Sequence, residues 1–279
     1  MSQRNSQAAK TAARERLRQE RERQAKRDKA KRQVVVAVSV VGVLAVVGGI
    51  SYAVIQNNKP SGWAAEKSAK VVAPANTTGA NGTTVVIGKA SAKKTLKVYE
   101  DPRCPACAAF EQTVGSTVRK DVDSGKYKLQ YIGGTFLDGD QMQNGTIGSN
   151  GVGSKNALSA MGAALDVSPQ AFLDYKSALY STKWHPDETV DTFKDDSYLI
   201  KVADTVPALK NNAKFDAAVK KGTYDAWAVA MSKTWATNKD GITGTPGFVM
   251  DGKKLTTDGK QPPMSVADFD RVVGAALKA

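Results

Sequence analysis

The two cysteines of the chain lie three positions apart, as Cys104 and Cys107 of a Cys-Pro-Ala-Cys segment. Residues 95–99 before them alternate between polar and apolar, as a strand does, and residues 108–124 after them carry apolar residues at helical spacing. The cysteines are therefore expected where a strand runs into a helix. The positive end of a helix favours a thiolate at Cys104 and lowers its pKa, so Cys104 could attack a disulfide and Cys107 could resolve the mixed disulfide.

Two other uses of the cysteine pair have less support. A structural zinc site needs further ligands, and besides the cysteines the chain offers one histidine, His185, and carboxylates. A structural disulfide across so few residues would close a very short loop and would stabilise the fold little. The residues therefore indicate a redox-active dithiol that works with neither a metal nor an organic cofactor.

The positive charge of the chain is concentrated at its start. The formal net charge is +13 at pH 7, and residues 1–33 hold 12 Lys and Arg against 4 Asp and Glu. Residues 34–55 carry no charge, and as a helix they would span about 33 Å, close to the hydrocarbon thickness of a bilayer. We therefore predict a single transmembrane anchor at 34–55. The positive-inside rule places residues 1–33 in the cytoplasm and the chain from Gln56 onward outside the cell membrane.

A buried core helix and a cleaved signal peptide are the alternatives for residues 34–55. The basic flank argues against a core helix. A signal peptide normally has a shorter charged region and a shorter apolar region that ends at a small-residue cleavage site. The tail at 1–33 could also bind acidic lipid or nucleic acid. Acidic residues interrupt its positive run, however, and it has no aromatic side chain for base stacking, so no nucleic-acid partner is predicted.

A linker and a folded domain are predicted after the anchor. Residues 56–82 are rich in Asn, Gly, Ala and Thr and are interpreted as the linker, with a short helix at 63–72 as an option. The domain is predicted at 83–279, as two strands, a helix, a strand, a block of helices, a hairpin and a closing helix. The expected segments are 84–87, 95–99, a helix stopped by Gly125, 128–136, a Gly-rich loop at 133–153, helices from about 155 to 238, a strand from 244, a tight turn at Asp251-Gly252, a return strand from Leu255, and a helix at 265–277 with Ser265 as N-cap and Asp268 at its third helical position.

Two motifs of this domain carry a family resemblance. The segment VYEDPRCPACAAFE follows a strand, and GTPGFVMDGK comes about 140 residues later. With the helical stretch that starts near Asn156, they make residues 83–279, about 70% of the chain, similar to the DsbA-like thiol-disulfide oxidoreductases of the thioredoxin superfamily. The resemblance implies an α/β thioredoxin fold with an inserted helical subdomain, here preceded by the single N-terminal transmembrane helix.

The resemblance also implies roles for two residues of the second motif. In this family the proline that matches Pro246 is cis and lies against the cysteine pair, and the backbone of Thr245 binds the substrate peptide as a short strand pair. From the residues alone, a trans proline that starts a strand is equally expected. With the resemblance, we predict a cis Thr245–Pro246 bond.

The chain departs from the family pattern in two places. Many relatives have a buried acidic residue six positions before the first cysteine, as proton acceptor for the inner thiol, where this chain has Val98. Glu100 could take this role from the same strand face; a solvated loop carboxylate is the alternative. The strong oxidants of the family carry a histidine between the cysteines. Pro105 and Ala106 therefore imply a milder oxidant, with a reduction potential of roughly −220 to −130 mV.

The function that the resemblance implies is that of a membrane-tethered oxidoreductase. It would introduce disulfides into exported proteins and would be reoxidised by a quinone-linked membrane thiol oxidase. A reductase or isomerase with the same site and the opposite redox poise is the alternative. A non-catalytic peptide-binding module on the same scaffold is a further alternative, although such a module would need neither cysteine.

Overall fold

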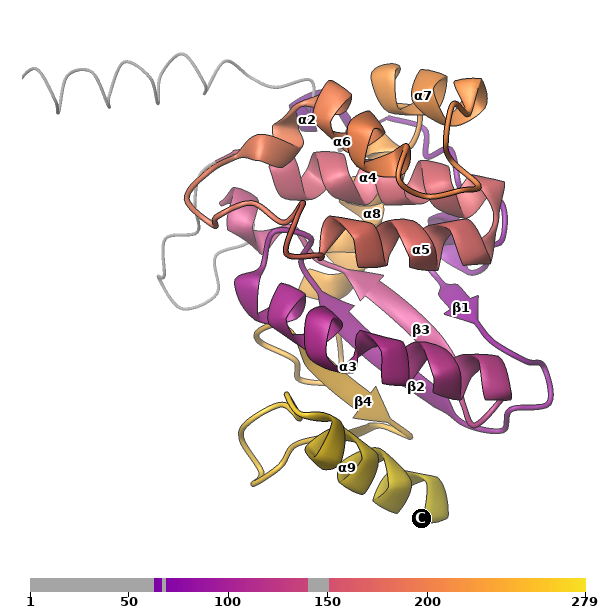
Figure 1. Cartoon of the computed structure of the whole chain (residues 1–279), viewed down its shortest axis with the longest axis vertical. Coiled ribbons are helices and arrows are strands. Elements are labelled where there is room, and N and C mark those ends of the chain that lie inside the picture. Colours follow the sequence, from indigo (N-terminus) through magenta and orange to yellow (C-terminus); the bar gives the residue numbers. More distant parts are fainter. Residues whose placement is uncertain (1–62, 67–68, 140–150) are drawn as a thin grey trace, which may run out of the picture. The chain divides into compact units, whose positions relative to one another are not determined.

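A mixed β-sheet lies at the centre of the folded domain (Figure 1). The computed structural model describes residues 63–66, 69–139 and 151–279, and within them the sheet has five strands in the order β1-β3-β2-β4-β5. Strands β2 and β3 run parallel, and the other neighbouring pairs are antiparallel. The strands are β1 (Val85–Ile87), β2 (Thr95–Glu100), β3 (Lys128–Gly133), β4 (Gly247–Met250) and β5 (Lys253–Lys254).

The central strand β2 delivers its last residue into the protein interior. Its register places Leu96 beside Leu129 and Val98 beside Tyr131, and all four side chains are buried. Strands of this kind are covered by helices on both faces of the sheet. Because β2 lies between β3 and β4, its end at Glu100 is enclosed as well, with 0% of its surface exposed.

Helices cover both faces of this sheet. Helices α3 (Pro105–Ser124) and α9 (Val266–Lys278) pack on one face, where the rings of Phe110, Phe248 and Phe269 contact one another with centroids 4.6 to 6.2 Å apart. Helix α8 (Asp225–Ala236) contacts β3 and lies behind the sheet in Figure 1. These contacts fix α3, and with it the two cysteines, against the end of β2.

The remaining helices form a block beside the sheet (Figure 1). Its centre is α4 (Gly153–Val167), which contacts α5, α7 and α8 and whose residues from Gly153 to Leu165 are all buried. The block interrupts the chain between β3 and β4, in the stretch where the sequence predicted helices. Its other members are α5 (Pro169–Leu179), α6 (Asp196–Ala203) and α7 (Ala213–Lys220), and the short α2 (Trp63–Glu66) contacts α8.

Three predicted chain reversals and helix ends are confirmed. Helix α3 ends at Gly125, whose φ of 86° is the left-handed conformation that glycine adopts without strain. Helix α9 begins after Ser265, whose hydroxyl accepts the N–H of Asp268 at 3.1 Å. The turn between β4 and β5 has positive φ at both Asp251 and Gly252, as a two-residue hairpin turn requires.

The strand predicted at 128–136 is shorter in the structure. It ends at Gly133, and the N–H of Gly134 then bonds the carbonyl of Glu100 at 2.7 Å, which closes the ladder with β2. The chain next enters a 3-10 turn at Phe136–Asp138. The two predictions at 128–136 and 133–153 overlapped, and the Gly133-Gly134 pair that begins the loop marks the stop, whereas Phe136 and Leu137 are as apolar as strand residues.

Two smaller predictions also need correction. The return strand was expected to begin at Leu255 but occupies Lys253–Lys254, because the two-residue turn brings the chain directly back into pairing with β4. The helix considered at 63–72 is reduced to Trp63–Glu66 among the described residues.

The described end of the predicted linker is bound to the domain. The N–H of Ala75 bonds the Asp166 carboxylate at 2.9 Å, and the indole N–H of Trp227 bonds the carbonyl of Gly82 at 2.8 Å. A composition rich in Asn, Gly and Thr therefore conceals a segment whose polar groups are used as hydrogen-bond partners by α4 and α8.

The N-terminal segments predicted from the sequence lie outside the described residues. This applies to the basic tail at 1–33, to the anchor at 34–55 and to the start of the linker. Within the ranges that the structure does describe, no helix is both long enough and apolar enough to cross a bilayer. The anchor therefore stays a prediction.

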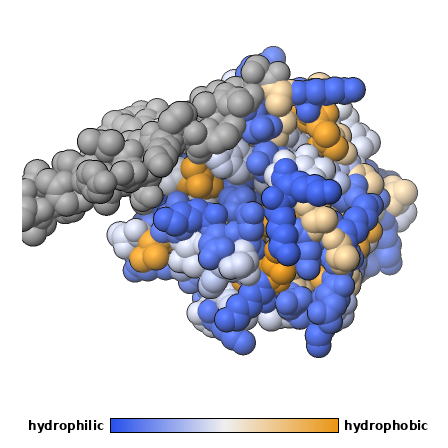
Figure 2. Space-filling view, turned by 90° about the horizontal axis from the view of Figure 1, so that it is seen from above, coloured by the Kyte–Doolittle hydropathy of each residue, from blue (hydrophilic) through white to orange (hydrophobic). Residues whose placement is uncertain are grey.

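The domain face shown in Figure 2 is mostly hydrophilic, with hydrophobic residues scattered over it. Of the large hydrophobic side chains in the described part of the chain, the exposed ones are single valines: Val72, Val86, Val190 and Val266. Scattered apolar residues are ordinary on a protein surface.

Candidate active site

The turn from β2 into α3 positions the two cysteines. Cys104 is the N-cap residue of α3 and Cys107 lies in its first turn, so the prediction of a strand running into a helix is confirmed. Both are thiols in this structure. Cys104 keeps 6% of its surface exposed and Cys107 keeps none. Cys104 is thus the more accessible sulfur, although it is less exposed than expected, because Leu137 and Tyr180 pack against the pair.

The loop before β4 lies against Cys104. The Thr245–Pro246 peptide bond is cis, as predicted, and the Cys104 thiol donates to the carbonyl of Thr245 over 3.7 Å. This contact joins residues 141 positions apart in the sequence. The two motifs that carried the family resemblance therefore meet at the sulfur of Cys104.

The surroundings set the acidities of the two thiols apart. A hydrogen bond from the Cys107 thiol lowers the pKa of Cys104 to about 6; burial opposes this, while the side chain of Thr245 and the backbone N–H groups of Ala106 and Cys107 assist it. Burial, followed by the hydrogen bond and the negative charge of Cys104, raises the pKa of Cys107 well above its usual value. At neutral pH the site therefore holds a thiolate at Cys104 beside a protonated Cys107.

Glu100 is buried beneath the cysteines and is not a solvated loop carboxylate. Burial raises its pKa to about 8, although Lys176, whose ammonium lies 2.9 Å from its carboxylate, opposes that rise. The negative charge of Glu100 in turn contributes to the raised pKa of Cys107. A carboxyl that titrates near neutrality next to the inner thiol has the properties needed to exchange a proton with it.

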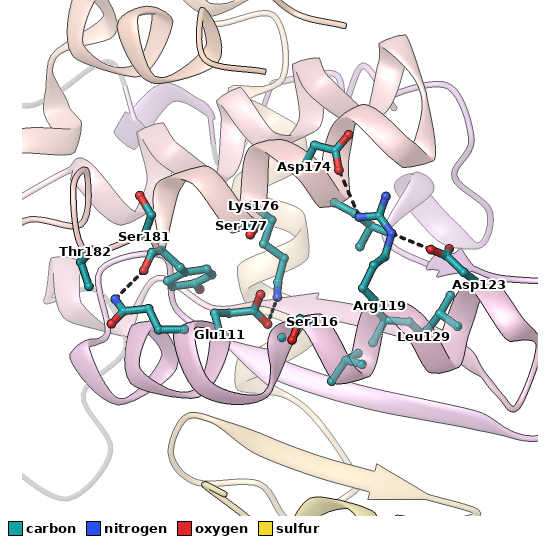
Figure 3. Close-up of a pocket in the computed structure, with 16 residues that line it drawn as sticks. Glu111, Ser116, Arg119, Asp123, Leu129, Asp174, Lys176, Ser177, Ser181 and Thr182 are labelled. Atoms are coloured by element: carbon teal, nitrogen blue, oxygen red, sulfur yellow. Dashed lines mark hydrogen bonds and ion pairs between the residues drawn. The ribbon is translucent and has the colours of Figure 1, made fainter. Parts of the chain in front are cut away.

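The buried cation beside Glu100 is Lys176, which no motif of the sequence indicated. Lys176 projects from α5 and lies between Glu100 and Glu111 of α3, and Figure 3 shows it pointing at Glu111. Burial alone would lower the pKa of Lys176, but the two carboxylates outweigh burial and hold it above its usual value. The available signal was a lysine four positions after the buried Phe172, on the apolar face of an amphipathic helix.

A groove of about 750 Å³ between α3 and α5 opens next to this buried pair (Figure 3). Glu111, Lys176 and Tyr180 are among the residues that line it. Glu111 and Lys176 therefore face this groove, and Cys104 is not among its lining residues.

The loop that carries Thr245 is held by its own polar contacts. The Asn238 amide donates to the carbonyl of Ile242 at 2.9 Å and accepts the N–H of Ile242 at 3.0 Å. Asp240 accepts from Tyr99 and pairs with Lys97 at 2.7 Å, both on β2. The strand that leads to Cys104 thus also anchors the loop that faces it, a role that no short motif of the sequence indicated.

The fold and the site define a class of protein: thioredoxin-like proteins with a helical insertion and a dithiol opposite a cis proline. The chain belongs to the thioredoxin family, because a family model described as Thioredoxin matches residues 80–273. The predicted resemblance to DsbA-like thiol-disulfide oxidoreductases is confirmed by the structures to which the chain is similar.

Two of these structures are oxidoreductases of actinobacteria. The reduced disulfide bond oxidoreductase DsbG from Mycobacterium tuberculosis is 25% identical, with a TM-score of 0.52 over 71% of this chain and 94% of that chain. MdbA, a thiol-disulfide oxidoreductase from Actinomyces oris, is 22% identical, with a TM-score of 0.55 over 75% of this chain and 92% of that chain.

A curated relative adds a likeness of another kind. The serine/threonine-protein kinase PknE of Mycobacterium tuberculosis is 24% identical over 178 residues, which are 61% of this chain and 29% of the kinase. The chain thus matches less than a third of that relative's length, and the kinase activity in its name is a property of the relative.

The acidity of Cys104 predicts a pH profile of alkylation. In the reduced protein, the rate of reaction of Cys104 with iodoacetamide should rise with pH, reach half of its maximum near pH 6 and level off above it, since only the thiolate reacts. Mass spectrometry of quenched samples measures the rate at each residue. In the control Cys104→Ala, Cys107 should stay unmodified at neutral pH. A midpoint at or above pH 8 for Cys104 would contradict the geometry described here.

The raised pKa of Glu100 predicts how stability depends on pH. An acid whose folded pKa lies above its unfolded value stabilises the fold below the unfolded value and loses this contribution as pH rises through the folded pKa. Between about pH 4.5 and pH 8, wild type should therefore lose unfolding free energy relative to Glu100→Gln, by about 1.4 kcal/mol for each unit of pKa shift at most. Cys104 titrates within this range in both reduced proteins, and its negative charge contributes to the raised pKa of Glu100.

Denaturant unfolding of reduced wild type and Glu100→Gln at a series of pH values measures this difference. Lys176 keeps Glu111 as its partner in the variant, so the cation is not left alone. The control Asp123→Asn changes a largely exposed carboxylate and should run parallel to wild type. Parallel curves for Glu100→Gln as well would show that Glu100 is ionised throughout this range.

Proposed function

We propose that this protein is an extracytoplasmic thiol-disulfide oxidoreductase that oxidises cysteine pairs of exported proteins through Cys104 and Cys107. One observation carries the proposal: Cys104 is stabilised as a thiolate at the start of α3, with the fully buried Cys107 and the cis Thr245–Pro246 bond both beside it. Attack, resolution and peptide contact each need one of these parts, and they meet at one point of the fold.

The exchange begins with the Cys104–Cys107 disulfide of the oxidised protein. A substrate thiolate attacks the sulfur of Cys104, because Cys107 has no exposed surface. The bond between the two cysteines breaks, and the sulfur of Cys107 leaves with the electron pair. Its high pKa means that this sulfur takes up a proton, which the carboxyl of Glu100 can supply when it is protonated.

The second half of the exchange releases the product. The second substrate thiolate attacks the substrate sulfur of the mixed disulfide and expels Cys104 as a thiolate. A thiol of low pKa is a good leaving group, and the pKa of about 6 keeps Cys104 ionised at neutral pH. The substrate loses two electrons and two protons in total; the protein takes up both electrons and one proton, as a Cys104 thiolate and a Cys107 thiol, and the second proton goes to solvent.

Reoxidation runs the inner proton transfer in reverse. Glu100 then accepts the proton of Cys107, so that the inner sulfur can attack the disulfide between Cys104 and an oxidant. We assign this oxidant to a quinone-linked thiol oxidase of the membrane, a class of partner that the family resemblance implies. Thr245 and Pro246 are assigned to the substrate peptide, which would lie along the Thr245 backbone as a short strand.

The proposal includes a place for the enzyme. Residues 34–55 would be a single-pass anchor, with residues 1–33 in the cytoplasm and the catalytic domain outside. Support comes from the uncharged run behind a strongly basic tail. An oxidising compartment also suits a catalyst whose disulfide has to persist between turnovers.

The division of roles between the cysteines predicts which variant traps substrates. In cells, Cys107→Ala should accumulate mixed disulfides with exported proteins through Cys104, because no inner thiol is left to resolve them. Cys104→Ala should accumulate several-fold fewer, since Cys107 is buried. Affinity purification under non-reducing conditions, followed by mass spectrometry with and without reductant, identifies the adducts. The double variant Cys104→Ala/Cys107→Ala sets the background, and equal trapping by both single variants would contradict the proposed roles.

A further inference from the structure

A second group of buried charges lies beside the turn that carries Cys104. Asp101, Arg103 and Asp138 expose 0%, 0% and 5% of their surfaces. Arg103 directly precedes Cys104 in the chain, and none of the three takes part in the exchange of thiols and protons. Charges buried this deeply are costly unless they are paired and hydrogen-bonded, so their contacts indicate what they hold in place.

Asp101 holds the backbone of the turn from both ends. Its Oδ1 accepts the N–H of Arg103 at 2.9 Å, and its own carbonyl accepts the N–H of Cys104 at 2.9 Å. The hydroxyl of Tyr180, which packs on the cysteines, donates to the same carbonyl at 3.0 Å. The residue before Cys104 and Cys104 itself are thereby both tied to Asp101.

The same carboxylate also reaches two segments outside the turn. Oδ1 accepts the hydroxyl of Ser154, at the start of α4, at 2.6 Å. Oδ2 accepts the N–H of Leu137, in the 3-10 turn after β3, at 3.1 Å. Asp101 therefore connects the cysteine turn to the helical block and to the turn that packs against the cysteines.

Arg103 reinforces this connection with its side chain. Its guanidinium lies 3.0 Å from Asp138 and 3.2 Å from Asp191, and it donates to the carbonyl of Glu188 at 3.0 Å. Asp138 in turn accepts the N–H groups of Ser154 and Lys155 at 2.9 and 2.8 Å. Asp138 lies in the 3-10 turn that Asp101 also contacts, and Asp191 adds the segment before α6 to this connection.

The backbone at the start of α4 is shaped for these carboxylates. Asp191 accepts the N–H of Val152 at 3.1 Å and of Gly153 at 2.9 Å. A Cβ at Gly153 would lie 2.3 Å from Asp191, so a larger residue there would separate them. Carboxylates at the positive end of a helix are favourable, and here they also link α4 to Arg103.

We propose that Asp101 is a positioning residue for Cys104. It ties the turn at Arg103 and Cys104 to the helical block, and this keeps the Cys104 sulfur aligned with the N–H groups at the start of α3. This inference rests on the proposed function in taking Cys104 as the attacking thiol. The N–H groups of Ala106 and Cys107 that stabilise the thiolate follow directly on the turn that Asp101 fixes. Loosening the turn moves those N–H groups relative to the sulfur, and hydrogen bonds weaken steeply with misalignment.

The variant Asp101→Asn tests this role without changing the size of the side chain. Both protonation forms of the carboxyl fit the contacts, because the protonated form can donate to Ser154 and still accept both N–H groups. An amide cannot do so: in either orientation its NH₂ group faces the N–H of Arg103 or that of Leu137. One backbone donor is then displaced from the site.

The readout is the pKa of Cys104 in the reduced protein, from thiolate absorbance and from iodoacetamide alkylation across a range of pH. We expect the pKa to rise by about one unit in Asp101→Asn, which leaves about a fifth of the thiolate at pH 6 and slows alkylation in proportion. Ser154→Ala, which removes a single donor to Asp101, should shift the pKa in the same direction by less and serves if Asp101→Asn does not fold.

The matched control is Asp166→Asn, at the far end of α4. Asp166 also accepts a backbone N–H, from Ala75 at 2.9 Å, and pairs with Lys214 at 2.8 Å, so its loss should lower the melting temperature without moving the pKa of Cys104. If Asp101→Asn and Ser154→Ala lower the melting temperature but keep the wild-type pKa, Asp101 is structural only and the inference fails. The readout uses no substrate, so failure of the wild type to exchange disulfides would count against the proposed function instead.

Discussion

A negative sulfur is held almost out of contact with water at Cys104, and the rest of the site depends on how that charge is compensated. Burial by itself favours the neutral thiol. The compensation comes from hydrogen bonds, first from the Cys107 thiol and then from Thr245 and the N–H groups at the start of α3. These donors come from the start of α3 and from the loop before β4, so the acidity of one thiol depends on the meeting of a helix start and a loop.

The same hydrogen bonds give the two cysteines opposite shifts in pKa. Cys107 donates to Cys104, and this contact, together with burial, is what makes Cys107 hard to ionise. An inner thiol of high pKa then needs a group to exchange its proton with, and Glu100 is the buried carboxyl whose charge contributes to its pKa. The charge of Lys176 lowers the pKa of that carboxyl below the value that burial alone would give it. The helical block thus supplies the cation that lowers the pKa of Glu100, the last residue of β2, against burial.

Much of the fold follows from local patterns, whereas the charged partners of the site do not. Alternation located β2, Gly125 marked the end of α3, and Ser265 with Asp268 marked the start of α9, because each depends on residues close in sequence. The burial of Glu100 depends on Lys176, 76 positions later, and the burial of Arg103 on Asp138 and Asp191. No periodicity reports such pairs, since a buried ion pair looks like two surface charges until the fold joins them.

The transmembrane anchor, by contrast, is predicted from the sequence alone. Its prediction rests on charge and length alone, which are strong signals for a membrane span, and it lies outside the described residues. The described domain does explain how the pKa of Cys104 is lowered with only Pro105 and Ala106 between the cysteines. Without a histidine there, hydrogen bonds from Cys107, the side chain of Thr245 and backbone N–H groups lower the pKa of Cys104, and the proposed oxidant of intermediate strength rests on this.

The reduction potential of the Cys104–Cys107 couple tests this account most directly. Equilibration of the protein with defined ratios of reduced and oxidised glutathione, followed by counting of free thiols, measures it. Stabilisation of the reduced form by the thiolate predicts a value between about −220 and −130 mV. A value at or below about −270 mV, the range of thioredoxin, would contradict the assignment as an oxidase and would indicate a reductase instead.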